Sequence, residues 1–290
     1  MECSGRTTNK GYYKVMAFWD KITSRGNVDD RRSVVSASGI GITGLLLLMG
    51  VTYLLGGNPL QVLLEQGPGQ LQEQVSEEDT SQYAGVDSYE LFVSQVLGST
   101  NDVWTTLFST LSKQYRPTEL VLFRNYTESG CGGANGVVGP HYCPTDEKVY
   151  LDETFFVELR DQLGAQGGDV AEAYVIAHEV GHHVQYQLGI LDTEPMSNTQ
   201  SIEVELQADC FAGLWAYSIK DQGVFEFGEI NEAIDAAAAV GDDRIQERTE
   251  GKIQPETWTH GSSAERVGAF NEGYNNGSLS ACLAYTKNTL

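Results

Sequence analysis

Positive charge is scarce in this chain of 290 residues: 18 lysines and arginines stand against 40 aspartates and glutamates, which gives a formal net charge of −22. Seven of the basic residues lie within residues 1–32, so only eleven are left for residues 33–290. A protein that binds nucleic acid needs basic patches that face the phosphates. We therefore expect no nucleic-acid partner, and we interpret the acids as a solubilising surface.

Charge of either sign is absent from residues 33–64, and the centre of this run, residues 39–57, is largely apolar. Nineteen helical residues span roughly 28 Å, at about 1.5 Å each, which is close to the hydrocarbon thickness of a bilayer. A signal peptide usually has a shorter apolar stretch nearer the N-terminus, and a buried helix of this length usually has a polar face. The run therefore predicts one transmembrane helix at residues 36–57.

No lysine or arginine follows the apolar run until Lys113, whereas basic residues crowd the side before it. By the positive-inside rule, residues 1–35 are expected in the cytoplasm and the rest of the chain outside it, in the periplasm or at the cell exterior of a bacterium. Residues 58–86 are rich in Gln, Glu, Gly and Pro, as a linker is. Residues 87–290 then form one domain.

Cysteines are few, and four of the five lie in the part expected to be exported. An even number there fits two disulfides. Of the three possible pairings we favour Cys131–Cys143, which closes a short Gly-rich loop and leaves Cys210–Cys282. A structural zinc site made of these cysteines is not favoured, because no C-x-x-C spacing is present.

The pattern after residue 87 is mostly helical. Apolar periodicity predicts one helix from residue 87 and a second at about 100–115, followed by a strand at 119–126 and a Gly-rich hairpin that ends in a strand at 149–152. Further helices are predicted at 153–163, 169–188, 200–220, 228–240 and 262–275. These elements predict a helix-dominated α+β domain with a small β-sheet.

The predicted helix at 169–188 carries the motif HExxH, with His178, Glu179 and His182. Residues i and i+4 share one helix face, so both imidazoles can point at one zinc ion. Zinc lowers the pKa of a water molecule towards ~7, and Glu179 can take its proton and pass it to the leaving amine. Two surface histidines are the alternative, but the flanking residues are apolar, and polar side chains on a buried helix need a partner.

A third ligand is expected from the next long helix, where Glu205 and Asp209 are also separated by four residues. We assign Glu205 as the ligand, which leaves one position open for water and substrate. We assign Asp209 as the acceptor that orients a ligand histidine. Exchanged roles and an exposed acidic face without a metal remain the alternatives.

HExxH followed by ExxAD resembles the gluzincins, zinc peptidases with a His-His-Glu ligand set. More closely, the chain resembles the bacterial neutral zinc metallopeptidase family of single-span membrane proteins. The resemblance implies a zincin-like domain behind one transmembrane helix, a bound Zn²⁺ and peptidase activity. The matching stretches are 27–32 (NVDDRR), 139–144 (GPHYCP), 149–152 (VYLD), 155–156 (FF), 173–185 (AYVIAHEVGHHVQ), 205–212 (ELQADCFA), 241–244 (GDDR) and 259–266 (THGSSAER).

The resemblance also implies an extra side chain that stabilises the oxyanion. His260 is the leading candidate and Arg266 the second, while a helix cap near Ser262 is the other role open to His260. His141 is expected in a loop. The hairpin that ends at 149–152 resembles the edge strand along which such enzymes bind an extended peptide.

These features together predict a membrane-anchored zinc endopeptidase that acts on peptides or proteins. A non-catalytic, zinc-stabilised scaffold is one alternative, but a structural site has no use for the base Glu179 beside an open position. A zinc amidase that acts on cell-wall peptides is the other, because the same chemistry permits it.

Overall fold

A four-stranded mixed sheet forms the base of the protein in a computed structural model that describes residues 17–32, 87–135, 138–191 and 196–286. The strand order is β1 (Asn27–Asp30), β2 (Glu119–Phe123), β6 (Lys148–Asp152) and β5 (His141–Cys143). The first three strands are parallel, and β5 runs antiparallel to β6 at the edge. The expected hairpin that ends at residues 149–152 is thus formed by β5 and β6, with β6 inside the sheet and β5 at one edge.

The two faces of this sheet bury different clusters, because successive side chains of a strand point to opposite sides. Leu120 and Leu122 of β2 belong to the main core with the helices, whereas Val121 and Phe123 pack in a small second core with Ala134. Ala134 lies in β4 (Gly132–Asn135), which forms an antiparallel hairpin with β3 (Tyr126–Ser129). The hairpin thus covers the face that the helices leave open.

Helices make up most of the remaining structure, which confirms the helix-rich α+β class. The first, α3 (Ser88–Thr110), is one continuous helix where the sequence predicts two, because nothing between Leu97 and Thr100 interrupts its buried face. The other helices are α4 (Phe155–Asp161), α5 (Asp169–Leu188), α6 (Asn198–Ile219), α7 (Ile230–Ala239), α8 (Asp242–Thr249), α9 (Ser263–Asn276) and α10 (Leu279–Leu283), with short 3₁₀ turns at Trp19–Lys21, Lys220–Gln222 and Pro255–Thr257.

Close helix crossings depend on glycine. A Cβ on Gly213 of α6 would lie 2.0 Å from the carbonyl oxygen of Phe270 in α9, and one on Gly273 of α9 would lie 2.0 Å from that of Cys210 in α6. The two helices therefore pack backbone to backbone. Both predicted disulfides are present, and the one between Cys210 and Cys282 ties α10 to α6 at this crossing.

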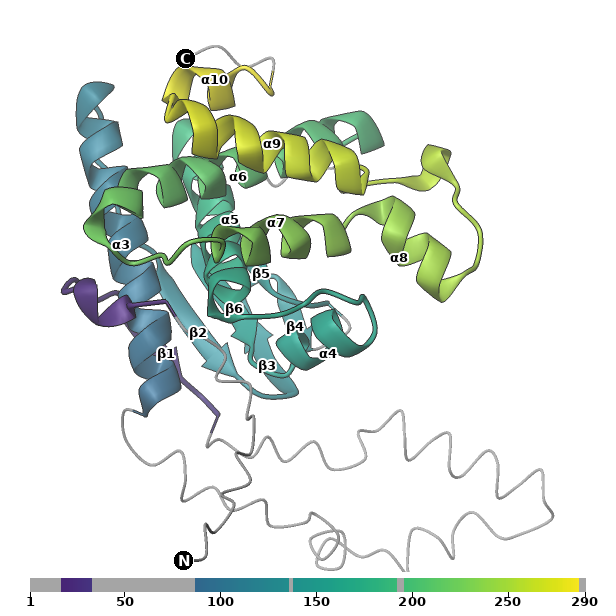
Figure 1. Ribbon diagram of the computed structural model, residues 1–290, viewed down its shortest axis with the longest axis horizontal. Coiled ribbons are helices and arrows are strands. Elements are labelled where there is room, and N and C mark those ends of the chain that lie inside the picture. The colour runs from purple at the N-terminus through teal and green to yellow at the C-terminus, as the bar shows by residue number, and fades with distance from the viewer. Residues whose placement is uncertain (1–16, 33–86, 136–137, 192–195, 287–290) are drawn as a thin grey trace, which may run out of the picture.

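Residues 17–32, expected to form a segment separate from the domain, pack against it along α3 and β2 (Figure 1). The expected transmembrane helix at 36–57 and the linker at 58–86 lie outside the described residues. Within the described ranges, no helix is both long and apolar enough to cross a membrane.

Candidate metal centre

The helices α5 and α6 cross at the centre of the HExxH motif. Gly181 lies between the two histidines, and a Cβ there would approach the Cα of Ala208 in α6 to 3.2 Å. A larger side chain at 181 would push the helices apart, and with them the ligands that each carries. α5 begins after Gly168 with the bounds predicted from the sequence, and a capping box of Ser197 and Gln200 starts α6.

Three predicted ligands meet at this crossing. One ligand atom from each of His178, His182 and Glu205 lies within 4.8 Å of the others. The Nε2 atom of His178 is 3.2 Å from one carboxylate oxygen of Glu205, and the Nε2 atom of His182 is 3.4 Å from the other. The two helices thus bring two imidazoles and one carboxylate to a single point.

The Nδ1 atom of each ligand histidine, on the other side of the ring from Nε2, forms a hydrogen bond with a protein side chain. Nδ1 of His178 is 2.9 Å from Oδ1 of Asp209, and Nδ1 of His182 is 2.8 Å from Oε1 of Gln185. Gln185 is fixed in turn, because its amide donates to the Val204 carbonyl oxygen at 2.7 Å. Such partners set the ring orientation and leave Nε2 for the metal. Asp209 was predicted in this role; Gln185 was not, although it lies three residues after His182.

Asp209 belongs to a fully buried charge network. It is 0% exposed and accepts hydrogen bonds from Nε of Arg266 at 2.7 Å, from Nη2 of Arg266 at 3.0 Å and from the hydroxyl of Tyr174 at 2.5 Å. Burial alone would raise the pKa of Asp209, but the charges of Arg266 and His178 hold it below its usual range. The carboxylate therefore stays ionised beside His178.

The pKa of the His178 imidazole is shifted by burial and by two neighbouring carboxylates. Burial would lower its pKa, whereas the carboxylates of Asp209 and Glu205 raise it to about 10. Glu205 shifts the opposite way: burial would raise its pKa, and the charges and hydrogen bonds of the two histidines lower it well below the usual value. A pocket this rich in negative charge is one that a cation stabilises.

The guanidinium of Arg266, the second candidate for oxyanion stabilisation, lies among Asp209, His178 and Glu205. Its side chain is 5% exposed, both of its bonds to Asp209 are made behind His178, and Nη1 donates to the Val240 carbonyl oxygen at 3.2 Å. Its Nη2 atom is also 3.7 Å from Oε2 of Glu205, so the guanidinium supports His178 through Asp209 and lies close to a second ligand; its role at the oxyanion stays a prediction.

Glu179 follows His178 directly on α5 and is 7% exposed. Within the described residues its carboxylate forms no hydrogen bond or ion pair. Neither of its oxygens is among the fully buried atoms that lack a partner, so the carboxylate keeps contact with solvent. Glu179 is thus unpaired and open to water, one residue along the helix from a ligand histidine.

His260 lies in the loop between α8 and α9 and is oriented by Asp242. Its Nδ1 atom is 3.0 Å from Oδ1 of Asp242, whose other oxygen accepts the backbone N–H groups of Thr259 and His260 at 2.8 and 2.7 Å. The hydrogen bond to Asp242 raises the pKa of His260, and the charge of Glu205 adds to the rise. The cap of α9 is instead Ser262, so His260 has no capping role.

The two remaining histidines have structural partners. His183 is 1% exposed, with Nδ1 3.1 Å from the Tyr142 hydroxyl and Nε2 2.7 Å from the Arg116 carbonyl oxygen. His141, expected in a loop, begins strand β5 and stacks on Tyr150 at 5.3 Å between ring centroids. Neither belongs to the triad.

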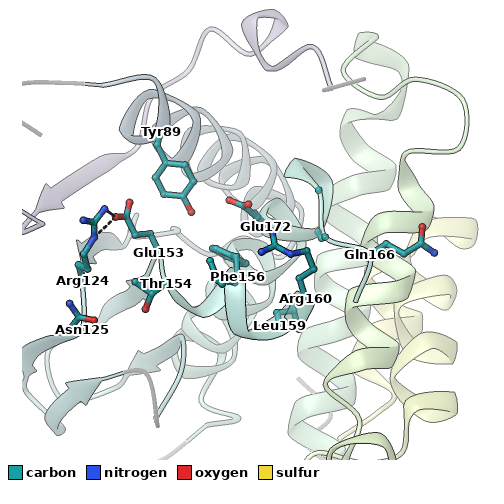
Figure 2. Close-up of a pocket in the computed structure, with 14 residues that line it drawn as sticks. Tyr89, Arg124, Asn125, Glu153, Thr154, Phe156, Leu159, Arg160, Gln166 and Glu172 are labelled. Carbon is teal, nitrogen blue, oxygen red and sulfur yellow. Dashed lines mark hydrogen bonds and ion pairs between the residues drawn. The ribbon is translucent and has the colours of Figure 1, made fainter. Parts of the chain in front are cut away.

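A cavity of about 530 Å³ lies apart from the triad, between α4, the start of α5 and the ends of β2 and β6 (Figure 2). Arg124 and Glu153 form an ion pair in its wall, and Glu172 of α5 points into it. None of the three ligands lines this cavity. It does not add to the metal site.

Comparison with known proteins adds independent information. A family model described as "Putative neutral zinc metallopeptidase" matches residues 16–285. The chain is 37% identical over 288 residues to the uncharacterized protein YpfJ of Escherichia coli (strain K12), which covers 93% of this chain and 99% of the relative. It is 40% identical over 249 residues to the uncharacterized protein Rv2575 of Mycobacterium tuberculosis (strain ATCC 25618 / H37Rv), which covers 80% and 84%. No solved structure matches significantly, so the expected zincin-like fold stays a prediction.

Proposed function

The chain belongs to the neutral zinc metallopeptidase family, and from this premise we propose that it hydrolyses peptide bonds with Glu179 as general base beside a zinc ion held by His178, His182 and Glu205. The observation that carries the proposal is the convergence of these three ligands from two helices, with Glu179 directly after His178 on one of them.

The donor set fits zinc. Ligand atoms about 2.0–2.1 Å from a tetrahedral zinc ion lie roughly 3.3 Å from one another. The distances from the two Nε2 atoms to the Glu205 oxygens are 3.2 and 3.4 Å. Three protein ligands also leave one position open, as catalytic zinc sites do and structural sites do not.

Held by His178, His182 and Glu205, a zinc ion would supply Lewis acidity, which lowers the pKa of a water molecule and polarises a carbonyl group. Glu179 then takes the proton of the attacking water and delivers it to the leaving amine. His260, with its pKa raised by Asp242, is protonated over a wider pH range than an ordinary histidine and donates to the oxyanion. The strand β5, at the sheet edge, offers backbone groups to an extended peptide.

The decisive experiment compares the full chain with its Glu179→Gln variant. We expect the variant to bind zinc as the parent does and to lose hydrolysis of a quenched fluorescent peptide library, by roughly the 10²–10⁴-fold that general acid–base catalysis contributes. Glu172→Gln is the matched control, because Glu172 lies on the same helix but points into the separate cavity.

A Glu179→Gln variant that cleaves as fast as the parent would exclude the assigned base. A parent that binds one zinc ion and cleaves neither the peptide library nor muropeptides would favour the non-catalytic scaffold. Cleavage of muropeptides alone would assign the same centre to a zinc amidase.

A further inference from the structure

Residues 17–32 are built into the same folded body as residues 87–286. Strand β1 is hydrogen-bonded in parallel to β2, in a register that runs from Asn27 opposite Glu119 to Asp30 opposite Leu122. Arg31 extends the pairing, because its N–H donates to the Leu122 carbonyl oxygen at 2.7 Å. Since β1 is the fourth strand of the sheet that supports α5, the N-terminal piece is part of the domain.

Trp19 joins this piece to the helix that carries the metal ligands. Its indole is 5% exposed and stacks on Trp215 of α6, with ring centroids 6.4 Å apart. Its Nε1 donates to Oδ2 of Asp169 at 2.7 Å, and the N–H of Ala17 donates to the same oxygen at 2.9 Å. Asp169 is the first residue of α5. The start of the metal helix is therefore held by residues that precede the apolar run.

Two glycines show how closely the pieces fit. A Cβ on Gly98 of α3 would lie 2.6 Å from the backbone nitrogen of Arg25, and a Cβ on Gly26 would lie 2.4 Å from the side chain of Leu97. Real Cβ atoms do not approach other atoms so closely. The N-terminal piece crosses α3 at the one place where both backbones lack a side chain.

Arg32 and Asp87, the described residues on either side of residues 33–86, lie beside each other in the folded domain. Arg32, whose side chain is 1% exposed, forms an ion pair with Asp87 at 3.1 Å and further pairs with Asp30 and Glu153 at 2.6 and 3.1 Å. The fold thus joins the two ends of residues 33–86, the part of the chain that contains the apolar run.

From these contacts we propose that residues 17–32 and 87–286 lie on the same, exported side of the membrane, and that the apolar run attaches the protein from that side instead of carrying the chain across once. The sequence alone predicts that residues 17–32 and residues 87–286 lie on opposite sides of the membrane. A hydrocarbon core about 30 Å thick cannot lie between strands that are about 4.8 Å apart. The two disulfides, which form in oxidising compartments, place the shared side outside the cytoplasm.

Ion pairs reduce the number of free positive charges that would place residues 17–32 in the cytoplasm. Arg31 and Arg32 are two of the seven basic residues before the run, and each is neutralised, by Asp29 and by the three acids around Arg32. Burial opposes the charge of Arg32, but its acidic partners keep its pKa above the ordinary value. These charges stabilise the fold and do not act as free topogenic charges.

The test is labelling of the full chain in bacterial spheroplasts with a membrane-impermeant maleimide-polyethylene glycol. In a Cys3→Ser background, single variants Thr23→Cys and Asp102→Cys report on the two pieces; both positions are exposed, and the other four cysteines are in disulfides. Lys21→Cys repeats the first measurement at a second exposed site. We expect positions 21, 23 and 102 to be labelled to the same extent before lysis, with the chain in the membrane fraction.

Protection of positions 21 and 23 while position 102 is labelled would overturn the proposal, as would protection of all three or recovery of the chain in the soluble fraction. A second measurement tests whether strand β1 pairs with β2 in the membrane-bound protein. The side chains of Asn27 and Glu119 are hydrogen-bonded at 2.6 Å, so an Asn27→Cys/Glu119→Cys pair should form a disulfide in the membrane fraction, seen as linked peptides by mass spectrometry. Its absence, with both single variants as controls, would also refute the shared side. Neither result depends on zinc or on hydrolysis.

Discussion

Asp209→Asn should weaken both zinc binding and folding, for two separable reasons. The amide keeps an acceptor for His178 but removes the negative charge that polarises it, and loss of such a partner typically lowers zinc affinity 10–100-fold. It also deprives Arg266, which is 4% exposed, of its nearest counter-charge and leaves only Glu205, at 3.7 Å. Breaking a buried ion pair from one side costs roughly 3–5 kcal/mol, so the metal-free protein should unfold at a lower denaturant concentration.

A double variant separates the two effects. Asp209→Asn/Arg266→Met removes both charges and keeps much of the buried volume, and replacement of a buried pair by apolar side chains is often close to neutral. The double variant should therefore regain most of the lost stability while its zinc affinity stays low. Urea denaturation in the presence of chelator measures the first quantity, and competition with a fluorescent zinc indicator measures the second.

Two results would refute this reasoning. If Asp209→Asn binds zinc as tightly as the parent, Asp209 does not tune His178. If the double variant recovers zinc affinity together with stability, the loss in the single variant reflects local unfolding and not the orientation of the ligand.

Three further changes are informative. Gly98→Ala should destabilise the protein by about 1–3 kcal/mol through the clash with Arg25, whereas Gly268→Ala, with open space around it, should be neutral or gain up to ~1 kcal/mol of helix propensity; equal denaturation midpoints would contradict the close crossing. Asp242→Asn should lower the raised pKa of His260. Because protonated His260 is lost as pH rises through its pKa, the alkaline fall of kcat/KM should then occur at a lower pH. An alkaline fall at the same pH in both proteins would exclude His260 as the donor. Removal of the Cys210–Cys282 disulfide, which closes the longer loop, should cost about 4 kcal/mol against about 3 kcal/mol for Cys131–Cys143, as read from chemical denaturation; the reverse order would show that loop closure is not the dominant effect.

The sequence predicts well what is decided locally. The bounds of α5 follow from Gly168 before it and Gly189 after it, at φ values of 131° and 75°, which other residues rarely adopt. The four-residue spacings within α5 and α6 place the ligands on one face of each helix. A helix period is sufficient for these predictions, and no contact between distant residues is needed.

Features that depend on distant partners escape such reasoning. Residues 27–30 contain two aspartates, and no strand is predicted there; they form one because β2 supplies the pairing. Asp242 and His260 are 18 residues apart, and only the packing of α8 beside α9 brings them into contact. The edge strand β5 is not predicted by itself because it is only three residues long, too short for a period-2 pattern to stand out.

Two places on α5, its first residue and its ligand His178, are positioned by parts of the chain that lie far from it in sequence. Trp19 fixes the start of α5 through Asp169, and Arg266 fixes His178 through Asp209. Loss of either contact removes one of the donors to a buried carboxylate, which is costly in a dry interior. The ligand geometry therefore depends on the docking of residues 17–32 as well as on α9. A protein in which a membrane separated those residues from α5 would have to form its zinc site without the contact that positions the helix carrying both histidines.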